Sequence, residues 1–312
     1  MTMTQSATMS SIERHNRPSY SEFVERFLLP RKAAIITGAL DQWKAVGKWT
    51  PQYFKERYGS MPLKPEGQYH TLQGFMPAKR DGEAFTMSEF IDLIISSSDE
   101  KPAPYLRNVW VEKFLPELDA DLDPLPEYFS PNWLDGAFTK PLYPRLHGGH
   151  SEFYIGGRGG KFPTLHYDSW HIHTFLCQIY GVKEYTILAP DQGRFLYPSD
   201  YHTSSIRDPE NVDLGTFPLF AQATPIRFKL QPGEILFVPA GWWHTQKMLT
   251  PSITISVSRV NSSNWKEFSR ELRKCAPPHV RPFVWTYLTG LRVSMAMRGS
   301  DNPKRNRVTT AR

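Results

Sequence analysis

The stretch from about residue 150 to 260 constrains the fold more than any other part of the chain. It is a succession of short runs rich in β-branched and aromatic residues, separated by Gly, Pro and Asp. In order, the runs are SEFYIGG, TLHYD, TFLCQIYG, KEYTILAP, IRFKLQ, EILFVPA and SITISVSRV. Short strands at such regular spacing are typical of antiparallel sandwiches and barrels. We therefore predict a mainly β fold.

Helical patterns flank this region on both sides. Ser19 and Glu22, and again Thr86 and Glu89, have the spacing of a capping box before an amphipathic run. Between these two runs, AAIITGAL has the β-branched character of a strand. Beyond about residue 264, WKEFSRELRK and PFVWTYLTGLRVSMAM return to helical character. The second is apolar enough either to join two copies as a homodimer or to pack on its own barrel.

These changes of pattern divide the chain into five segments. They are a disordered N-terminus (1–17), a helix and strand region that packs on the core (18–148), the β core (149–262), C-terminal helices (263–297) and a basic flexible tail (298–312). The tail composition indicates a solvated segment, with a contact to nucleic acid or an acidic partner as the alternative. Nucleic acid is not the partner we expect.

Cysteine usage and hydropathy indicate the compartment. Cys177 and Cys275 are too few for a disulfide framework, so we expect two reduced thiols in a cytoplasmic protein. The N-terminus lacks the apolar segment of a secretory signal. No run of about 18 apolar residues occurs, so we expect no membrane span.

Histidine and aspartate are concentrated in TLHYDSWHIHTF, residues 164–175. His166 and Asp168 are two apart in a strand-like run, so both side chains project from one face. His244 follows another apolar strand and a tight turn, where an antiparallel barrel could bring it beside the pair. Two histidines and one carboxylate leave coordination positions open, as non-haem Fe(II) oxygenases require. A structural zinc site would use four ligands, usually with cysteine, and neither cysteine has that spacing.

An iron oxygenase must also obtain two electrons beyond those its substrate supplies. 2-Oxoglutarate provides them by oxidative decarboxylation, and its distal carboxylate needs a cation. Lys183 lies 17 residues after His166, just past a glycine turn in CQIYGVKEYTI. We predict that Lys183 binds the distal carboxylate.

Five motifs together resemble the JmjC (cupin-like) 2-oxoglutarate oxygenases. They are HYD at 166–168, QIYGVK at 178–183, LAPDQ at 188–192, YP at 197–198 and PGEILFVPAGWWH at 232–244. The resemblance covers roughly residues 18–265. It is strongest to the asparaginyl hydroxylase that inhibits hypoxia-inducible factor and to bacterial cupin-like hydroxylases.

This resemblance implies a double-stranded β-helix, the jelly-roll core of cupins, with helices packed outside. It implies that His166, Asp168 and His244 bind Fe(II) and act in catalysis. It also implies that 2-oxoglutarate is the cosubstrate, bound by Lys183 and by Tyr105.

The chain departs from the family pattern around the cosubstrate. Many members carry threonine three residues before the first ligand, where this chain has Pro163, and Thr164 is the nearest threonine. Where some members carry asparagine, this chain has Thr174 or Leu176. Where others carry threonine and asparagine after the last ligand, it has Ser256 and Ser258. We expect Thr164, Thr174 and Ser256 to contact 2-oxoglutarate.

Other polar and aromatic residues are candidates for contacting the substrate or for orienting a ligand. They are His171, His173, Trp170, Arg158 and Trp243. Arg158 is at the tip of GGRGG, which we interpret as a hairpin turn because no P-loop helix follows it.

We predict an Fe(II)- and 2-oxoglutarate-dependent dioxygenase that uses O₂ and hydroxylates an amino-acid residue in a protein or peptide. A small-metabolite hydroxylase is the alternative. An N-methyl-lysine demethylase and an inactive cupin-like binding protein rank lower.

Overall fold

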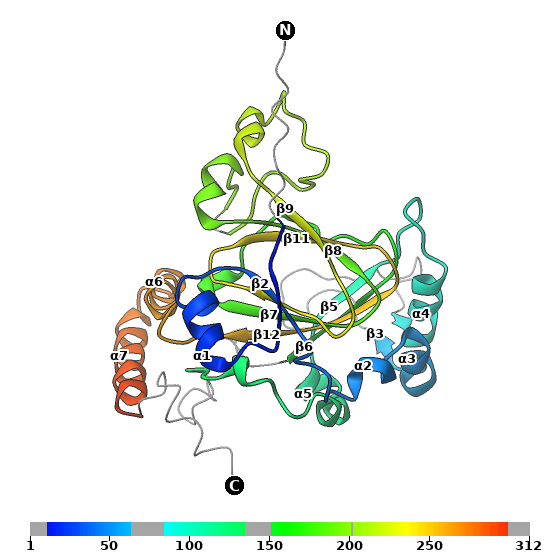
Figure 1. Ribbon diagram of the computed structural model, residues 1–312, viewed down its shortest axis with the longest axis horizontal. Helices are drawn as coiled ribbons and strands as arrows, with labels where there is room; N and C mark the ends of the chain where they lie inside the picture. Colours follow the sequence, from blue (N-terminus) through cyan, green and yellow to red (C-terminus); the bar gives the residue numbers. More distant parts are fainter. Residues whose placement is uncertain (1–10, 64–83, 135–150, 201, 299–312) are drawn as a thin grey trace.

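Two facing β-sheets form the centre of the protein (Figure 1). The structure is a computed structural model, and it describes residues 11–63, 84–134, 151–200 and 202–298. The larger sheet runs β1 (Arg14–Asn16), β2 (Ala34–Thr37), β10 (Ile235–Val238), β7 (His173–Tyr180), β12 (Ser252–Arg259), β6 (Ser151–Gly156) and β5 (Tyr105–Trp110). The smaller sheet runs β11 (Trp243–Met248), β8 (Lys183–Leu188) and β9 (Ile226–Leu230). The predicted mainly β fold with flanking helices is confirmed.

Strand pairing explains how the larger sheet separates a polar interior from an apolar core. β12 pairs antiparallel with both β6 and β7, so that Ser256 lies between Glu152 and Leu176. Alternate side chains of these strands point to opposite faces. One face lines a cavity between the two sheets. The other face packs with the N-terminal helices in the main hydrophobic core, contributing Phe153, Phe175 and Ile255.

Helices surround the sheets. They are α1 (Tyr20–Phe23), continued by a π-helical turn (Val24–Leu28), α2 (Ala45–Lys48), α3 (Pro51–Tyr58), α4 (Met87–Ile95), α5 (Val111–Phe114), α6 (Trp265–Cys275) and α7 (Arg281–Arg298). Short 3₁₀ turns cover Pro116–Asp121, Glu127–Phe129, Ser169–His171, Pro190–Phe195 and Pro218–Gln222. β3 (Pro62–Leu63) and β4 (Phe85–Thr86) form a small separate ladder. Figure 1 places α6 and α7 on the opposite side of the sheets from α3 and α4.

The helix starts follow the local signals in the sequence. Thr86 accepts a hydrogen bond from the Glu89 amide, and the Glu89 carboxylate accepts one from the Thr86 amide, which completes the predicted capping box of α4. Thr50 accepts a hydrogen bond from the Tyr53 amide at the start of α3. Each bond satisfies an amide that the first helical turn leaves without an intrahelical partner.

The N-terminal boundary of the ordered chain differs from the expectation. Part of the segment expected to be disordered, residues 1–17, forms β1, which pairs parallel with β2. Its sequence, RHN, carries no strand signal; the pairing and the ion pair of Arg14 with Glu234, at 2.8 Å, hold it in place. Residues 1–10 and the basic tail from 299 lie outside the described residues.

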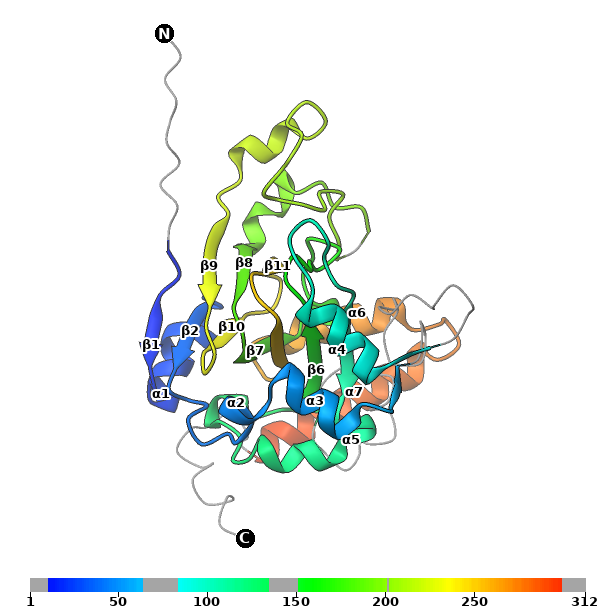
Figure 2. The same ribbon diagram turned by 90° about the vertical axis from the view of Figure 1, so that its right-hand side faces the viewer.

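Two elements of the β core also differ from the sequence pattern. β11 has the sequence WHTQKM, which is too polar to predict as a strand, yet it pairs along its length with β8. TLHYD forms isolated bridges rather than a regular strand. The connection between β8 and β9, residues 189–225, stands out beyond the sheets in both views (Figures 1 and 2). Among the described residues, no helix combines the length and apolar character needed to span a membrane.

Candidate metal centre and cosubstrate pocket

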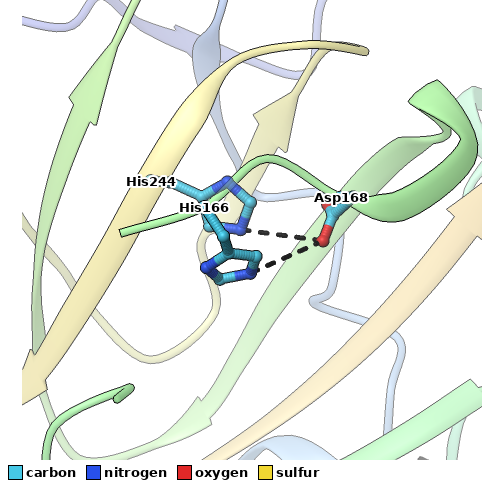
Figure 3. Close-up of side chains that lie close together, drawn as sticks. All are labelled: His166, Asp168 and His244. Carbon is cyan, nitrogen blue, oxygen red and sulfur yellow. Dashed lines mark ion pairs between the residues drawn. The ribbon is translucent and has the colours of Figure 1, made fainter. Parts of the chain in front are cut away.

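His166 and His244 are brought together by backbone pairing. The His166 amide donates to the His244 carbonyl at 3.1 Å, and the His244 amide donates in return, at 2.6 Å. Their ring centroids lie 4.4 Å apart. Asp168 faces both rings, with Oδ1 at 3.9 Å from Nε2 of His166 and 3.8 Å from Nε2 of His244 (Figure 3).

Backbone carbonyls set the tautomer of both imidazoles. Nδ1 of His166 lies 3.1 Å from the Thr164 carbonyl, and Nδ1 of His244 lies 3.1 Å from the Trp242 carbonyl. A carbonyl only accepts, so each Nδ1 carries the proton and each Nε2 presents a lone pair. Burial and the neighbouring His244 hold the pKa of His166 well below its usual range, so this ring is neutral.

The Asp168 carboxylate is oriented by one further side chain. Thr174, at the start of β7, donates its hydroxyl proton to Oδ2 of Asp168. The second oxygen, Oδ1, is the one that faces the two Nε2 atoms. Thr174 was expected to contact the cosubstrate; its position orients the acidic member of the triad, although it also lines the cavity.

The three donors fit Fe(II). Their ligand atoms all lie within 4.8 Å of one another. Oδ1 of Asp168 is 3.9 and 3.8 Å from the two Nε2 atoms, which is within the roughly 4.2 Å that can separate two donors at about 2.1 Å from one ion. Two imidazoles and one carboxylate form the donor set of non-haem iron sites with open positions. Among the described residues, no other group of three such side chains meets this criterion.

A cavity of about 420 Å³ extends from the triad between the two sheets. Its floor is the polar face of β6, β7 and β12, and its far wall comes from β8 and β11. The cavity is therefore enclosed by strands from both halves of the jelly roll, with the triad at one end and Lys183 in its wall.

Lys183 is fully buried, and its ammonium group lies beside the hydroxyl of Tyr105. Nζ donates to the Tyr105 hydroxyl at 3.1 Å, and the same hydroxyl accepts from Nε2 of Gln246 at 2.6 Å. Burial lowers the pKa of Lys183 to about 7. An anion beside Nζ would reverse that effect, because a nearby opposite charge favours the protonated form.

The comparison with protein families agrees with this arrangement. The model of the cupin-like domain matches residues 20–261. The chain belongs to the cupin-like family. Membership supports the jelly-roll core, which is the fold that the sequence motifs imply.

The chain is also similar to several curated proteins. The chain is 28% identical to Lysine-specific demethylase 8 of Xenopus tropicalis, over 79% of this chain and 52% of the relative. It is 26% identical to Arginine-specific demethylase JMJ20 of Arabidopsis thaliana, over 83% of this chain and 61% of the relative. It is 25% identical to 2-oxoglutarate and iron-dependent oxygenase JMJD4 of Mus musculus, over 84% of this chain and 64% of the relative. The aligned part thus spans a little over half the length of these relatives.

The remaining predicted residues of this cupin-like chain divide into two groups. Thr164, Ser256 and Trp170 line the cavity. The cavity lining does not include Arg158, Trp243, His171 and His173. Arg158 pairs with Asp99 on the surface, at 2.8 Å, and Trp243 packs in a small apolar cluster with Leu165 and Leu188.

His171 and His173 differ from the expectation of a substrate contact. His173 is fully buried: its Nδ1 accepts from the Ala240 amide at 3.1 Å, and its Nε2 lies 2.7 Å from the Ser263 hydroxyl. Burial lowers its pKa to about 3. His171 stacks on Tyr167 and pairs with Glu271 of α6 at 2.9 Å. The turn at Ser169–His171, with positive φ at Trp170 and His171, separates both residues from the strand-like run of His166 and Asp168.

Sequence reasoning missed several polar residues of the cavity. They are Arg107, Asn108, Glu152, Asp200, His202 and Gln246. Strand alternation from Tyr105 identifies Arg107, and alternation from His244 identifies Gln246. No local signal identifies Asp200 and His202, which reach the cavity from the connection between β8 and β9.

Proposed function

We propose that the protein is an Fe(II)- and 2-oxoglutarate-dependent oxygenase that hydroxylates an unactivated C–H bond. The observation that carries this proposal is the joint placement of the three donors and the buried Lys183 in the wall of one cavity. Bound Fe(II), with 2-oxoglutarate and O₂, would supply the oxidising chemistry and leave succinate and CO₂ as co-products.

The protein's own residues position and enclose the reactants. His166, Asp168 and His244 would hold the ion, with Thr174 orienting the carboxylate. Lys183 and Tyr105 would bind the distal carboxylate of 2-oxoglutarate through charge-assisted hydrogen bonds. Lys183 and Tyr105 are both buried, and the low local dielectric of a buried site strengthens these interactions.

For the substrate, we propose an amino-acid residue in a protein or peptide, with a small metabolite as the alternative. Demethylation of an N-methyl group is a second candidate, because two of the relatives are named as lysine- and arginine-specific demethylases. It needs the same hydroxylation of a C–H bond, after which the hydroxymethyl amine releases formaldehyde. Because both cysteines are free, with Cys177 buried, we also propose a cytoplasmic location.

The experiment is to supply Fe(II), 2-oxoglutarate and O₂ to the purified protein and to measure succinate. Asp168→Ala should abolish succinate formation and Fe(II) binding together, because it removes a donor of the triad. Asp41→Ala, which removes an exposed carboxylate that pairs with Arg17, is the matched control and should behave as wild type. Wild-type protein that binds neither Fe(II) nor 2-oxoglutarate would contradict the proposal.

Peptides and metabolites can then be screened by mass. Hydroxylation adds the mass of one oxygen atom, whereas demethylation removes one methylene for each methyl group and releases formaldehyde. The two candidate reactions therefore give mass changes of opposite sign.

A further inference from the structure

Gln246 is a buried polar residue of the cavity wall for which the proposed reaction gives no role. It is 9% exposed and lines the same cavity as Lys183 and Tyr105. Its backbone is held on both sides, because it pairs with Tyr185 of β8 and its carbonyl accepts from the Phe162 amide at 2.9 Å. Burying an amide is costly unless it is hydrogen-bonded, so the partner of this side chain indicates its role.

Three side chains from both sheets meet at the Tyr105 hydroxyl. Tyr105 comes from β5 of the larger sheet, whereas Lys183 and Gln246 come from β8 and β11 of the smaller sheet. The ring of Tyr105 packs closely against β6, where a Cβ added to Gly156 would lie 2.9 Å from Cδ2 of the ring. Packing therefore fixes the ring, and the hydrogen bonds of the hydroxyl decide where its proton points.

Both partners of the Tyr105 hydroxyl donate to it. Nζ of Lys183 lies at 3.1 Å and Nε2 of Gln246 at 2.6 Å. With an anion beside it Lys183 is an ammonium group, which has donors only, and the amide N–H of Gln246 takes the second lone pair. Burial raises the pKa of Tyr105, so the hydroxyl keeps its own proton.

That proton is left for a third group. Among the described residues, no side chain or carbonyl accepts it, since the two partners of the hydroxyl are both donors. With both lone pairs occupied, the hydroxyl can only donate to what enters the cavity. Together with Lys183 it presents donors alone, which matches a carboxylate, because an ionised carboxylate only accepts.

We propose that Gln246 is a positioning residue for the cosubstrate: it occupies one lone pair of the Tyr105 hydroxyl and so directs the proton to the distal carboxylate of 2-oxoglutarate. Without Gln246, the hydroxyl is free to accept a hydrogen bond from a ligand as well as to donate one. Gln246 thereby selects a carboxylate over a neutral amide, whose N–H groups would meet donors. This inference rests on the proposed function.

A double-mutant cycle tests whether Gln246 acts through Tyr105. The measurement is calorimetric binding of 2-oxoglutarate to Zn(II)-loaded protein, which has no redox activity. Gln246→Met removes the amide and keeps the length of the side chain, and it should weaken binding by about three- to tenfold. In the Tyr105→Phe background the same change should alter binding by less than about twofold, because the hydroxyl that it positions is already gone.

The C5 amide of 2-oxoglutarate tests the selection of a carboxylate. Wild type should bind it at least about tenfold more weakly than 2-oxoglutarate, and this preference should narrow in Gln246→Met. A general loosening of the cavity would weaken both ligands alike and leave the preference unchanged. An unchanged preference would therefore contradict the proposal.

Gln52→Met is the matched control, because Gln52 is exposed on α3 and donates to Glu56 at 2.9 Å. It should bind both ligands as wild type does. Gln246→Met protein that matches wild type would overturn the proposal, and so would a loss that persists in full in the Tyr105→Phe background, since Gln246 would then act on the cosubstrate without Tyr105.

The same titrations separate this inference from the proposed function. If wild type binds 2-oxoglutarate and Lys183→Ala does not, the cosubstrate site stands whatever the result at Gln246. If wild type itself binds no 2-oxoglutarate, the proposed function fails first. Circular dichroism of each variant establishes that a loss of binding is not a loss of folding.

Discussion

Thr174 donates its hydroxyl proton to Oδ2 of Asp168, and this bond turns Oδ1 toward His166 and His244. Residues that orient a metal ligand contribute to metal affinity although they do not touch the ion. Thr174 is the first residue after His173 in β7, so the start of a core strand fixes the carboxylate of the triad.

Thr174→Val should weaken metal binding by about 10- to 100-fold, because it removes the hydroxyl and keeps the β-branched shape. Competition between the protein and a metal-sensitive chelator measures this affinity. Thr174→Ser retains the hydroxyl and should bind metal nearly as wild type. Equal metal affinity in the valine variant and wild type would show that the hydrogen bond does not matter for metal binding.

Lys183 should make the stability of the ligand-free protein depend on pH. Its pKa is about 7 in the folded protein, whereas an unfolded lysine titrates near about 10.4. Below about pH 7 both states hold the proton, and burial of the ammonium opposes folding in full. As the pH rises from about 7 toward about 10, the unfolded state holds more protons than the folded state, so the free energy of unfolding rises.

Lys183→Met should therefore be more stable than wild type at pH 6, by roughly 2–4 kcal/mol, since one pKa unit corresponds to about 1.4 kcal/mol. The difference should narrow by pH 9. Urea denaturation at both pH values, without metal or 2-oxoglutarate, measures it. Lys229→Met, at an exposed position of β9, should show no such pH dependence. A constant difference between pH 6 and 9 would contradict the lowered pKa.

Tyr105→Phe should weaken 2-oxoglutarate binding by about tenfold. The lost hydroxyl accepts bonds from Lys183 and Gln246, which leaves its proton to donate to a carboxylate. Calorimetry on Zn(II)-loaded protein measures the affinity. Tyr185→Phe is the matched control, because the buried Tyr185 hydroxyl has no hydrogen-bond partner among the described residues. If both variants lose affinity equally, the effect comes from general loosening of the cavity.

Glu271→Gln should destabilise the turn that follows Asp168. Glu271 pairs with His171 at 2.9 Å, and both Trp170 and His171 have positive φ, at 59° and 49°. Such conformations persist only when their surroundings hold them. We expect a loss of about 1 kcal/mol in unfolding free energy, measured by urea denaturation. The exposed Glu25→Gln should match wild type; a comparable loss there would mean that any surface charge has this effect.

Local signals in the sequence determined the elements that depend on interactions between residues close in sequence. The capping box of Thr86 and Glu89 places the start of α4, and alternating apolar residues place β7 and β12. The spacing of His166 and Asp168 predicted a metal and cosubstrate site only together with His244 after a distant strand, Lys183 beyond a glycine turn and the resemblance of the surrounding motifs to a family. These features depend on residues close in sequence, where backbone geometry fixes how side chains are directed.

Only the tertiary structure decided which distant groups meet. The polar sequence of β11 becomes a strand because β8 supplies its hydrogen-bond partners, and this pairing carries His244 to His166. The turn after Asp168 takes His173 out of the cavity. The register of β5 shifts between Leu106 and Val109, and both Arg107 and Asn108 line the cavity. Alternation along a regular strand would instead place these two neighbours on opposite faces. Pairing energy between strands far apart in sequence, which no local pattern records, settles these positions.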